Sequence, residues 1–152
     1  MQKLAQITVF LSTLLLYGCA SIDFPSSFNT TQDIHATPDT GTSRVIFFNP
    51  ISEMGRKFNV NMGVKIEIDG QAGPYIQHSH YFQVFLSSGG HVIKLEHVDP
   101  VAFSDTYKIV VNDDNDLYIK VSRKLFGNDL EIVDKLPNEF EQDYKPAKSY
   151  NK

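Results

Sequence analysis

The chain has 152 residues, of which 41% are hydrophobic and 21% are charged. This length suits a single domain, and this balance is typical of a protein that buries a core, so wholesale disorder is excluded. The net charge of −4 excludes the basic surface expected of a nucleic-acid-binding protein. A single cysteine excludes an intrachain disulfide and an all-cysteine zinc site.

Residues 1–18 have the organisation of a signal peptide. Lys3 gives the start of the chain a positive charge, and residues 4–16 form a mostly apolar run that is too short for an ordinary membrane-spanning helix. The segment ends at Gly18, a small residue that lets a peptidase reach the next peptide bond. We therefore expect the mature chain to begin after Gly18.

The sequence Leu16-Tyr17-Gly18-Cys19 is similar to the lipobox of bacterial lipoproteins. In that class the cysteine thiol accepts diacylglycerol, and the new α-amine accepts a fatty acyl chain such as palmitate. The resemblance therefore implies a lipid on Cys19 that holds the protein on a membrane. Ala20 follows instead of aspartate, which in enteric bacteria favours the outer membrane, facing the periplasm. A plain secretory signal followed by a free cysteine is the alternative.

After the lipobox motif the composition divides the chain into three parts. Residues 19–42 begin with the lipidated cysteine and continue with mostly small polar residues, which predicts a flexible tether. Residues 43–136 form the expected folded domain. Residues 137–152 are a polar tail, in which the helical spacing of Phe140 and Tyr144 predicts one or two helical turns if they dock. The alternatives for this tail are a partner-binding segment and a frayed terminus.

Within residues 43–136 short apolar runs alternate with turn signals. In residues 64–68 apolar residues alternate with charged ones, and Asp69-Gly70 follows directly, which is a strong hairpin signal. Gly73-Pro74 marks a second break. About seven strands and no long helix predict an all-β fold, either a single antiparallel β-sandwich or a small barrel. The expected strands are residues 44–49, 64–68, 81–86, 91–97, 106–111, 117–122 and 130–133.

The order of motifs in this domain carries a family resemblance. The motifs are Arg44-Val45-Ile46-Phe47, Val64-x-Ile66-x-Ile68-Asp69-Gly70 with Gly73, Tyr81-Phe82-x-Val84-x-Leu86, Gly90-His91 and Leu117-Tyr118-Ile119-Lys120-Val121. Their order resembles a family of uncharacterised bacterial lipoproteins whose β-sandwich is similar to prealbumin and to PEGA surface domains. The resemblance covers roughly residues 43–135 and implies a prealbumin- or immunoglobulin-like sandwich. It implies no catalytic residue, because none is established for that family.

His78 and His80 are the candidate metal ligands. Residues two apart on a strand face the same side, so both imidazoles would reach one ion if they lie on a strand. A third ligand would come from His91, His97 or Asp99. The alternative is two exposed histidines beside the start of a strand, and no cofactor is expected.

A hydrolase is a further alternative. Ser88-Gly89-Gly90-His91 places a hydroxyl near an imidazole, with His97 and Asp99 close by in the sequence. The segment lacks the Gly-x-Ser-x-Gly elbow of the α/β-hydrolases, and a turn is a sufficient explanation for the two glycines.

Four aromatic residues alternate away from the expected core faces, and we expect them to form a candidate interaction surface. Exposed together, they would make an adhesive patch for a protein or a glycan. The alternative is that an edge of the sandwich or the tail covers them. The four residues are Phe48, Tyr81, Phe85 and Tyr118.

These patterns predict a lipid-anchored protein of the bacterial cell envelope that acts as a non-enzymatic interaction or scaffold module. Its expected partners are the membrane, through the lipid on Cys19, and an envelope protein. A small-ligand or metal-binding lipoprotein is the first alternative, and an unrecognised hydrolase is the second.

Overall fold

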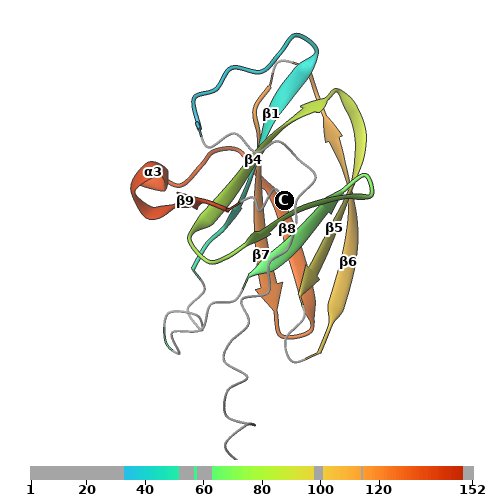
Figure 1. Ribbon diagram of the computed structural model, residues 1–152, viewed down its shortest axis with the longest axis vertical. Coiled ribbons are helices and arrows are strands. Elements are labelled where there is room, and N and C mark those ends of the chain that lie inside the picture. Colours follow the sequence, from blue (N-terminus) through green and yellow to red (C-terminus); the bar gives the residue numbers. More distant parts are fainter. Residues whose placement is uncertain (1–32, 52–56, 58–62, 98–100, 114, 149–152) are drawn as a thin grey trace, which may run out of the picture.

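The computed structural model describes residues 33–51, 57, 63–97, 101–113 and 115–148. The expected signal peptide, the cleavage site at Gly18 and the lipidation site at Cys19 lie outside these residues. Two β-sheets pack against each other, and their strands run mostly along the long axis of the molecule (Figure 1).

Five strands form one sheet and four form the other. The first sheet has the order β8-β7-β1-β4-β9, and the second has the order β3-β2-β5-β6. The strands are β1 (Thr42–Asn49), β2 (Val64–Ile68), β3 (Gln71–Ile76), β4 (His80–Ser87), β5 (Gly89–His97), β6 (Phe103–Val111), β7 (Leu117–Lys124), β8 (Gly127–Val133) and β9 (Lys145–Pro146).

The main core lies between the two sheets. β2 shows why the strands form, because Val64, Ile66 and Ile68 are buried while Lys65 and Glu67 between them are half-buried. Burying each such side chain stabilises the fold by about 1.5–3 kcal/mol. The core continues across both sheets through Val45, Phe47, Phe82, Val84, Ile93, Leu95, Ile109, Ile119 and Val121.

The prediction of an all-β fold is confirmed, but the prediction of seven antiparallel strands is wrong. β1 runs parallel to β7, and β4 runs parallel to β9, so the five-stranded sheet is mixed. The described residues form nine strands, because β3 and β9 add to the seven expected ones.

β3 includes Gly73 and Pro74, where the sequence predicts a break. β3 is the outermost strand of its sheet, and a proline is tolerated at such an edge because its missing N–H costs no ladder hydrogen bond. Gly73 lies where a Cβ would come within 2.6 Å of Cγ2 of Ile66, and the β2–β3 register shifts at this point. The glycine therefore permits a close approach of two strands and does not end one.

The tail is not a frayed terminus in residues 137–148. The short helix α3 (Phe140–Asp143) places the Phe140 ring, 4% exposed, on the outer face of the five-stranded sheet. Beyond the helix, the N–H of Lys145 donates to the carbonyl of Ser79, and the N–H of Ala147 donates to that of Tyr81. The helical spacing of Phe140 and Tyr144 thus does correspond to a short helix, but the frayed terminus that the polar composition favoured is wrong for these residues, because the tail docks on the sheet.

The last residues of the expected tether also contact the domain. Nη1 of Arg44 donates to the carbonyl oxygen of Ile34 over 2.6 Å, and Nε2 of Gln83 donates to that of Asp33 over 3.0 Å. The Ile34 side chain packs on the same outer-face cluster as Phe140. Residues 33–42 therefore differ from a free tether, because side chains of the sheet hold their backbone.

Candidate functional site

Phe48 and Tyr81 are not part of an exposed aromatic patch. Phe48 is 2% exposed and Tyr81 is 6% exposed. Phe140 covers both, with ring centroids 5.8 Å from Phe48 and 5.2 Å from Tyr81, and Tyr144 stacks on Phe140 at 4.7 Å. The interaction-surface prediction is wrong for these two residues, because the tail supplies the cover that the sequence left as the alternative.

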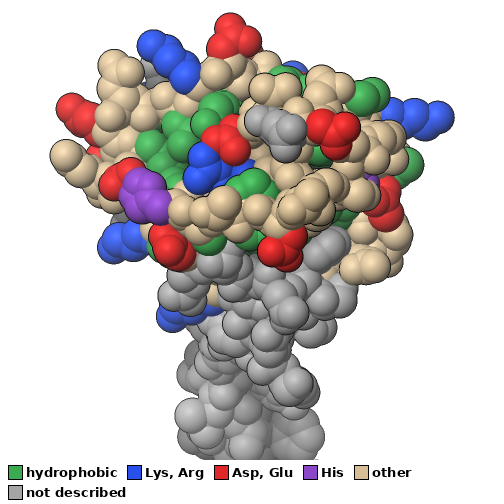
Figure 2. Space-filling view, turned by 90° about the horizontal axis from the view of Figure 1, so that it is seen from above, with side chains coloured by type: hydrophobic (Ala, Val, Ile, Leu, Met, Phe, Trp, Pro, Cys, Tyr) green, Lys and Arg blue, Asp and Glu red, His purple; other side chains and the backbone are tan. Residues whose placement is uncertain are grey.

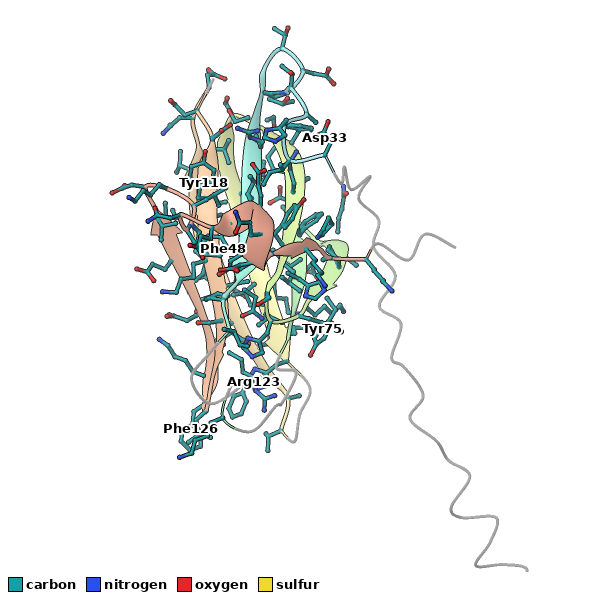
Figure 3. All side chains as sticks on the ribbon, turned by 90° about the vertical axis from the view of Figure 1, so that its left-hand side faces the viewer. Asp33, Phe48, Tyr75, Tyr118, Arg123 and Phe126 are labelled. Atoms are coloured by element: carbon teal, nitrogen blue, oxygen red, sulfur yellow. The ribbon has the colours of Figure 1, made fainter. Side chains whose placement is uncertain are left out.

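Phe85 and Tyr118 are half-buried, so the four aromatics do not form one surface. Tyr118 lines an open groove of about 410 Å³ on the outer face of the five-stranded sheet. One side of the groove is formed by residues 34–35 and another by residues 136–142. Figure 3 shows α3 lying over the sheet, with Phe48 and Tyr118 near it.

The lining of the groove combines apolar and polar groups. Its apolar residues are Ile34, Ile46, Leu136, Pro137 and Phe140, and its polar residues include His35, Arg44, Asn138, Glu141 and Gln142. Figure 2 shows the upper end of the molecule, where hydrophobic side chains lie among acidic, basic and histidine side chains. A volume of this size fits a few side chains of a partner.

Arg44 is held in a network at one wall of the groove. Its guanidinium donates twice to the carboxylate of Asp116, with Nε 3.0 Å from Oδ1, and the Tyr118 hydroxyl donates to Oδ2 of the same carboxylate. Hydrogen bonding to Asp116 raises the pKa of Arg44, and the same bonds lower the pKa of Asp116. The network keeps a charged group in place beside the apolar lining.

A weaker contact joins the two chain segments that border the groove. Nε2 of His35 lies 3.5 Å from Oε1 of Glu141, and both side chains are more than half exposed. An ion pair so open to water contributes little stability. The two segments that meet at this border of the groove can therefore separate at little cost in free energy.

His78 and His80 do not lie on one strand. His78 precedes β4 in a turn, and Ser79 between the two histidines has a φ of +56°. Nδ1 of His78 bonds the carbonyl of Pro50, and Nδ1 of His80 bonds the carbonyl of His78, each over 2.8 Å. The metal-site prediction assumes that both histidines lie on one strand, and this assumption is wrong. Within the described residues, no three His, Cys, Asp or Glu side chains gather where they could hold a metal ion.

The serine and histidine of the hydrolase alternative are bonded to other groups. The Ser88 hydroxyl donates to the Asp113 carboxylate, while His91 bonds Asp69 through one ring nitrogen and the carbonyl of Ser87 through the other. Both ring nitrogens of His91 are therefore bonded to groups other than the Ser88 hydroxyl, whose proton a general base would accept.

His97 is the other histidine of that alternative. It lies six residues along β5 from His91, about 20 Å away at strand spacing. Its Nδ1 bonds Oδ1 of Asn128 inside the core, and Asp99 lies outside the described residues.

A second exposed feature is the turn between β7 and β8. Leu125 is 72% exposed and Phe126 is 81% exposed. Val101, 58% exposed, and Phe103 lie at the same end, with the Phe103 and Phe126 rings 6.5 Å apart. We call Val101, Phe103, Leu125 and Phe126 the hairpin tip. The sequence signal that could have revealed this surface is the presence of two large apolar residues in a turn, where polar residues are usual.

Among the described residues, no helix is both long and apolar enough to cross a membrane. Comparisons of the whole chain with known proteins give no family assignment. No family model matches the sequence, and neither a curated protein nor a solved structure matches it.

Proposed function

We propose that this protein is a lipid-anchored module of the bacterial cell envelope that binds a partner protein and catalyses no reaction. The lipobox-like residues 16–19 support the anchor, with lipid on Cys19 and the outer membrane, facing the periplasm, as the location. The order of motifs in residues 43–135 supports a prealbumin-like β-sandwich of the uncharacterised lipoprotein family that it resembles.

The groove beside Tyr118 is the observation that carries the binding function. It is open to solvent, it has an apolar lining, and the Arg44–Asp116 pair adds fixed hydrogen-bonding groups at its wall. Such a mixture suits an extended peptide segment. One apolar side chain of the peptide would insert into the groove, and the peptide backbone would form hydrogen bonds with groups at the rim. Residues 34–35, at its border, follow directly on the segment that connects to Cys19, so the lipid would tether a bound partner to the membrane at a distance set by the length of that segment.

Site-specific photocrosslinking in living cells tests this function. A photoreactive phenylalanine analogue replaces His35 at the groove, and in a matched control it replaces Val110, which is 63% exposed on the four-stranded sheet. We expect a discrete crosslinked protein from position 35 that is absent from position 110. Crosslinking of the same proteins from both positions would contradict a partner in the groove.

The anchor is tested separately with Cys19→Ala. This variant should lose its lipid and leave the membrane fraction, and the crosslink from position 35 should weaken because the protein is no longer held near its partner. A Cys19→Ala protein that stays with the membrane as firmly as the unaltered protein would contradict a lipid anchor on this residue.

A further inference from the structure

The hairpin tip exposes apolar surface that the fold does not need. Leu125 and Phe126 are the most exposed of the large hydrophobic residues in the described part of the chain. They form a two-residue turn, since Lys124 pairs with Gly127 across the ladder, and such turns normally carry glycine, asparagine or aspartate. Gly127, with a φ of +120°, provides the unusual backbone conformation of this turn. Leu125 and Phe126 therefore serve neither the core nor the turn geometry.

The stem below the tip is firmly fixed. The N–H of Asn128 donates to Oδ2 of Asp105 over 2.6 Å, and the Tyr107 hydroxyl donates to the carbonyl of Asn128 over 2.7 Å. These bonds join β8 to β6 of the other sheet. The tip is thus presented as a rigid, convex projection at one end of the molecule (Figures 1 and 3).

We infer that the hairpin tip inserts into the interfacial region of the lipid bilayer that holds the Cys19 lipid, an inference that depends on the lipid anchor of the proposed function. A projecting leucine and phenylalanine fit between lipid chains, and aromatic rings favour the level of the headgroups. Residues 123–126 carry two positive charges, of which that of Lys124 is paired with Asp129, so the apolar side chains supply most of the attraction to the bilayer. The ammonium of Lys124 pairs with Oδ1 of Asp129 over 2.9 Å, and its side chain is 60% exposed, so it would exchange this carboxylate for a lipid phosphate while its stem lies on the tip.

The length of the chain outside the structure allows this arrangement. Ile34 and Tyr118 line the same groove, and Tyr118 lies six residues along β7 from Lys124 at the base of the turn, so the groove is about 20 Å from the base of the tip at strand spacing. The chain from Cys19 to Asp33, which has 14 residue spacings, spans at most about 46–50 Å when extended. The lipid on Cys19 can therefore enter the same bilayer that the tip contacts, with the groove on the side away from the membrane.

Tryptophan fluorescence tests the inference, because the protein contains no native tryptophan. Phe126→Trp places the probe at the tip, and Val110→Trp, seven residues beyond Phe103 on β6, is the matched control. Each full-length lipidated variant is purified from membranes and reconstituted into vesicles of phosphatidylethanolamine and phosphatidylglycerol, with and without brominated acyl chains. Brominated chains quench only a tryptophan that enters the bilayer.

We expect the Phe126→Trp emission to shift to shorter wavelength and to lose intensity with brominated lipid, while the Val110→Trp emission does neither. Leu125→Asp added to Phe126→Trp should abolish both changes. Unquenched, water-like emission from Phe126→Trp in protein that floats with the vesicles would overturn the inference and leave the anchor intact. Protein that fails to float with the vesicles would overturn the anchor and the inference together. Quenching at both positions would overturn a contact specific to the tip.

Discussion

The carboxylate of Asp69 lies 2.6 Å from Nδ1 of His91 and joins the β2–β3 turn to the start of β5. Nε2 of His91 lies 2.8 Å from the carbonyl oxygen of Ser87, and Oδ1 of Asp69 accepts the N–H of Val92. Burial lowers the pKa of His91, but the bonds to Asp69 and Ser87 and the charge of Asp69 outweigh it and raise the pKa above 6.5. Burial raises the pKa of Asp69, but the bonds from Val92 and His91 lower it below 3.8.

Asp69→Asn should therefore destabilise the protein in a pH-dependent way. The raised pKa of His91 means that its charge stabilises the fold fully below pH 6.5 and loses this effect as the pH rises through the folded-state value. The lowered pKa of Asp69 means that its charge contributes above pH 3.8 and loses this effect as the pH falls through the folded-state value. Asparagine tolerates the φ of +50° at this position, so the variant removes charge without straining the turn.

Urea unfolding at pH 5.5 and pH 9 measures this effect. We expect Asp69→Asn to lower the free energy of unfolding by about 1 kcal/mol at pH 5.5, the scale of a partly exposed ion pair, and by less at pH 9. His91→Gln should show the same pH trend. A loss that is larger at pH 9 than at pH 5.5 would contradict a charged His91 in the folded protein.

Gly73→Ala should destabilise the fold through a steric clash. Its Cβ would lie 2.6 Å from Cγ2 of Ile66 and 3.1 Å from the carbonyl oxygen of Ile66, so β3 must move away from β2. We expect a loss of about 1–3 kcal/mol in the free energy of unfolding, measured by urea denaturation. Gly90→Ala is the control, because its Cβ meets no atom within 4 Å. Equal stability of the two variants would show that β3 does not approach β2 this closely.

Local patterns predicted the strands well and their arrangement poorly. Residues 64–68 alternate clearly, and Asp69 and Gly70 adopt the positive φ values of +50° and +80° that suit the predicted hairpin turn. The parallel pairing of β1 with β7 has no local signal, since it joins residues about 70 positions apart, such as Val45 and Leu117. A pattern of period two assigns a side chain to a face but does not say which strand lies beside it.

The candidate site depends on the same kind of distant contact. The sequence placed Phe48 and Tyr81 on the face that points away from the space between the sheets, but both are buried there in a second hydrophobic cluster. Their cover depends on Phe140, one of few apolar residues in a polar tail, and its docking is a tertiary event that spacing alone does not reveal. The groove likewise depends on Arg44 meeting Asp116, 72 residues away.

Phe140→Ala should release the tail from the five-stranded sheet. The ring packs on three aromatic rings, and losing a buried phenylalanine costs about 3–5 kcal/mol where the cavity persists. Because the tail can detach locally, we expect a smaller global loss and much faster hydrogen exchange at the amides of Lys145 and Ala147, which bond Ser79 and Tyr81. Tyr144→Phe keeps its ring and should leave this exchange nearly unchanged. Unchanged protection in Phe140→Ala would show that the tail is held by other contacts.

Asn128→Ala should weaken the junction between the two sheets. Asn128 is 6% exposed on β8, and its Nδ2 donates to the carbonyl of Leu95 on β5 over 3.1 Å. Its Oδ1 accepts from Nδ1 of His97, which is 2% exposed. Truncation leaves a buried carbonyl and a buried imidazole N–H without this partner, and each such group costs about 1–3 kcal/mol.

Urea denaturation again measures the loss, with Asn115→Ala as the control. Asn115 is exposed, and its amide only bonds the nearby carbonyl of Asp113, so this variant should stay within about 0.5 kcal/mol of the unaltered protein. The free energy of unfolding of Asn128→Ala should be clearly lower than that of Asn115→Ala and that of the unaltered protein. If Asn128→Ala proved as stable as Asn115→Ala, the polar junction between β8 and β5 would contribute nothing, and apolar packing alone would hold the two sheets together at this end.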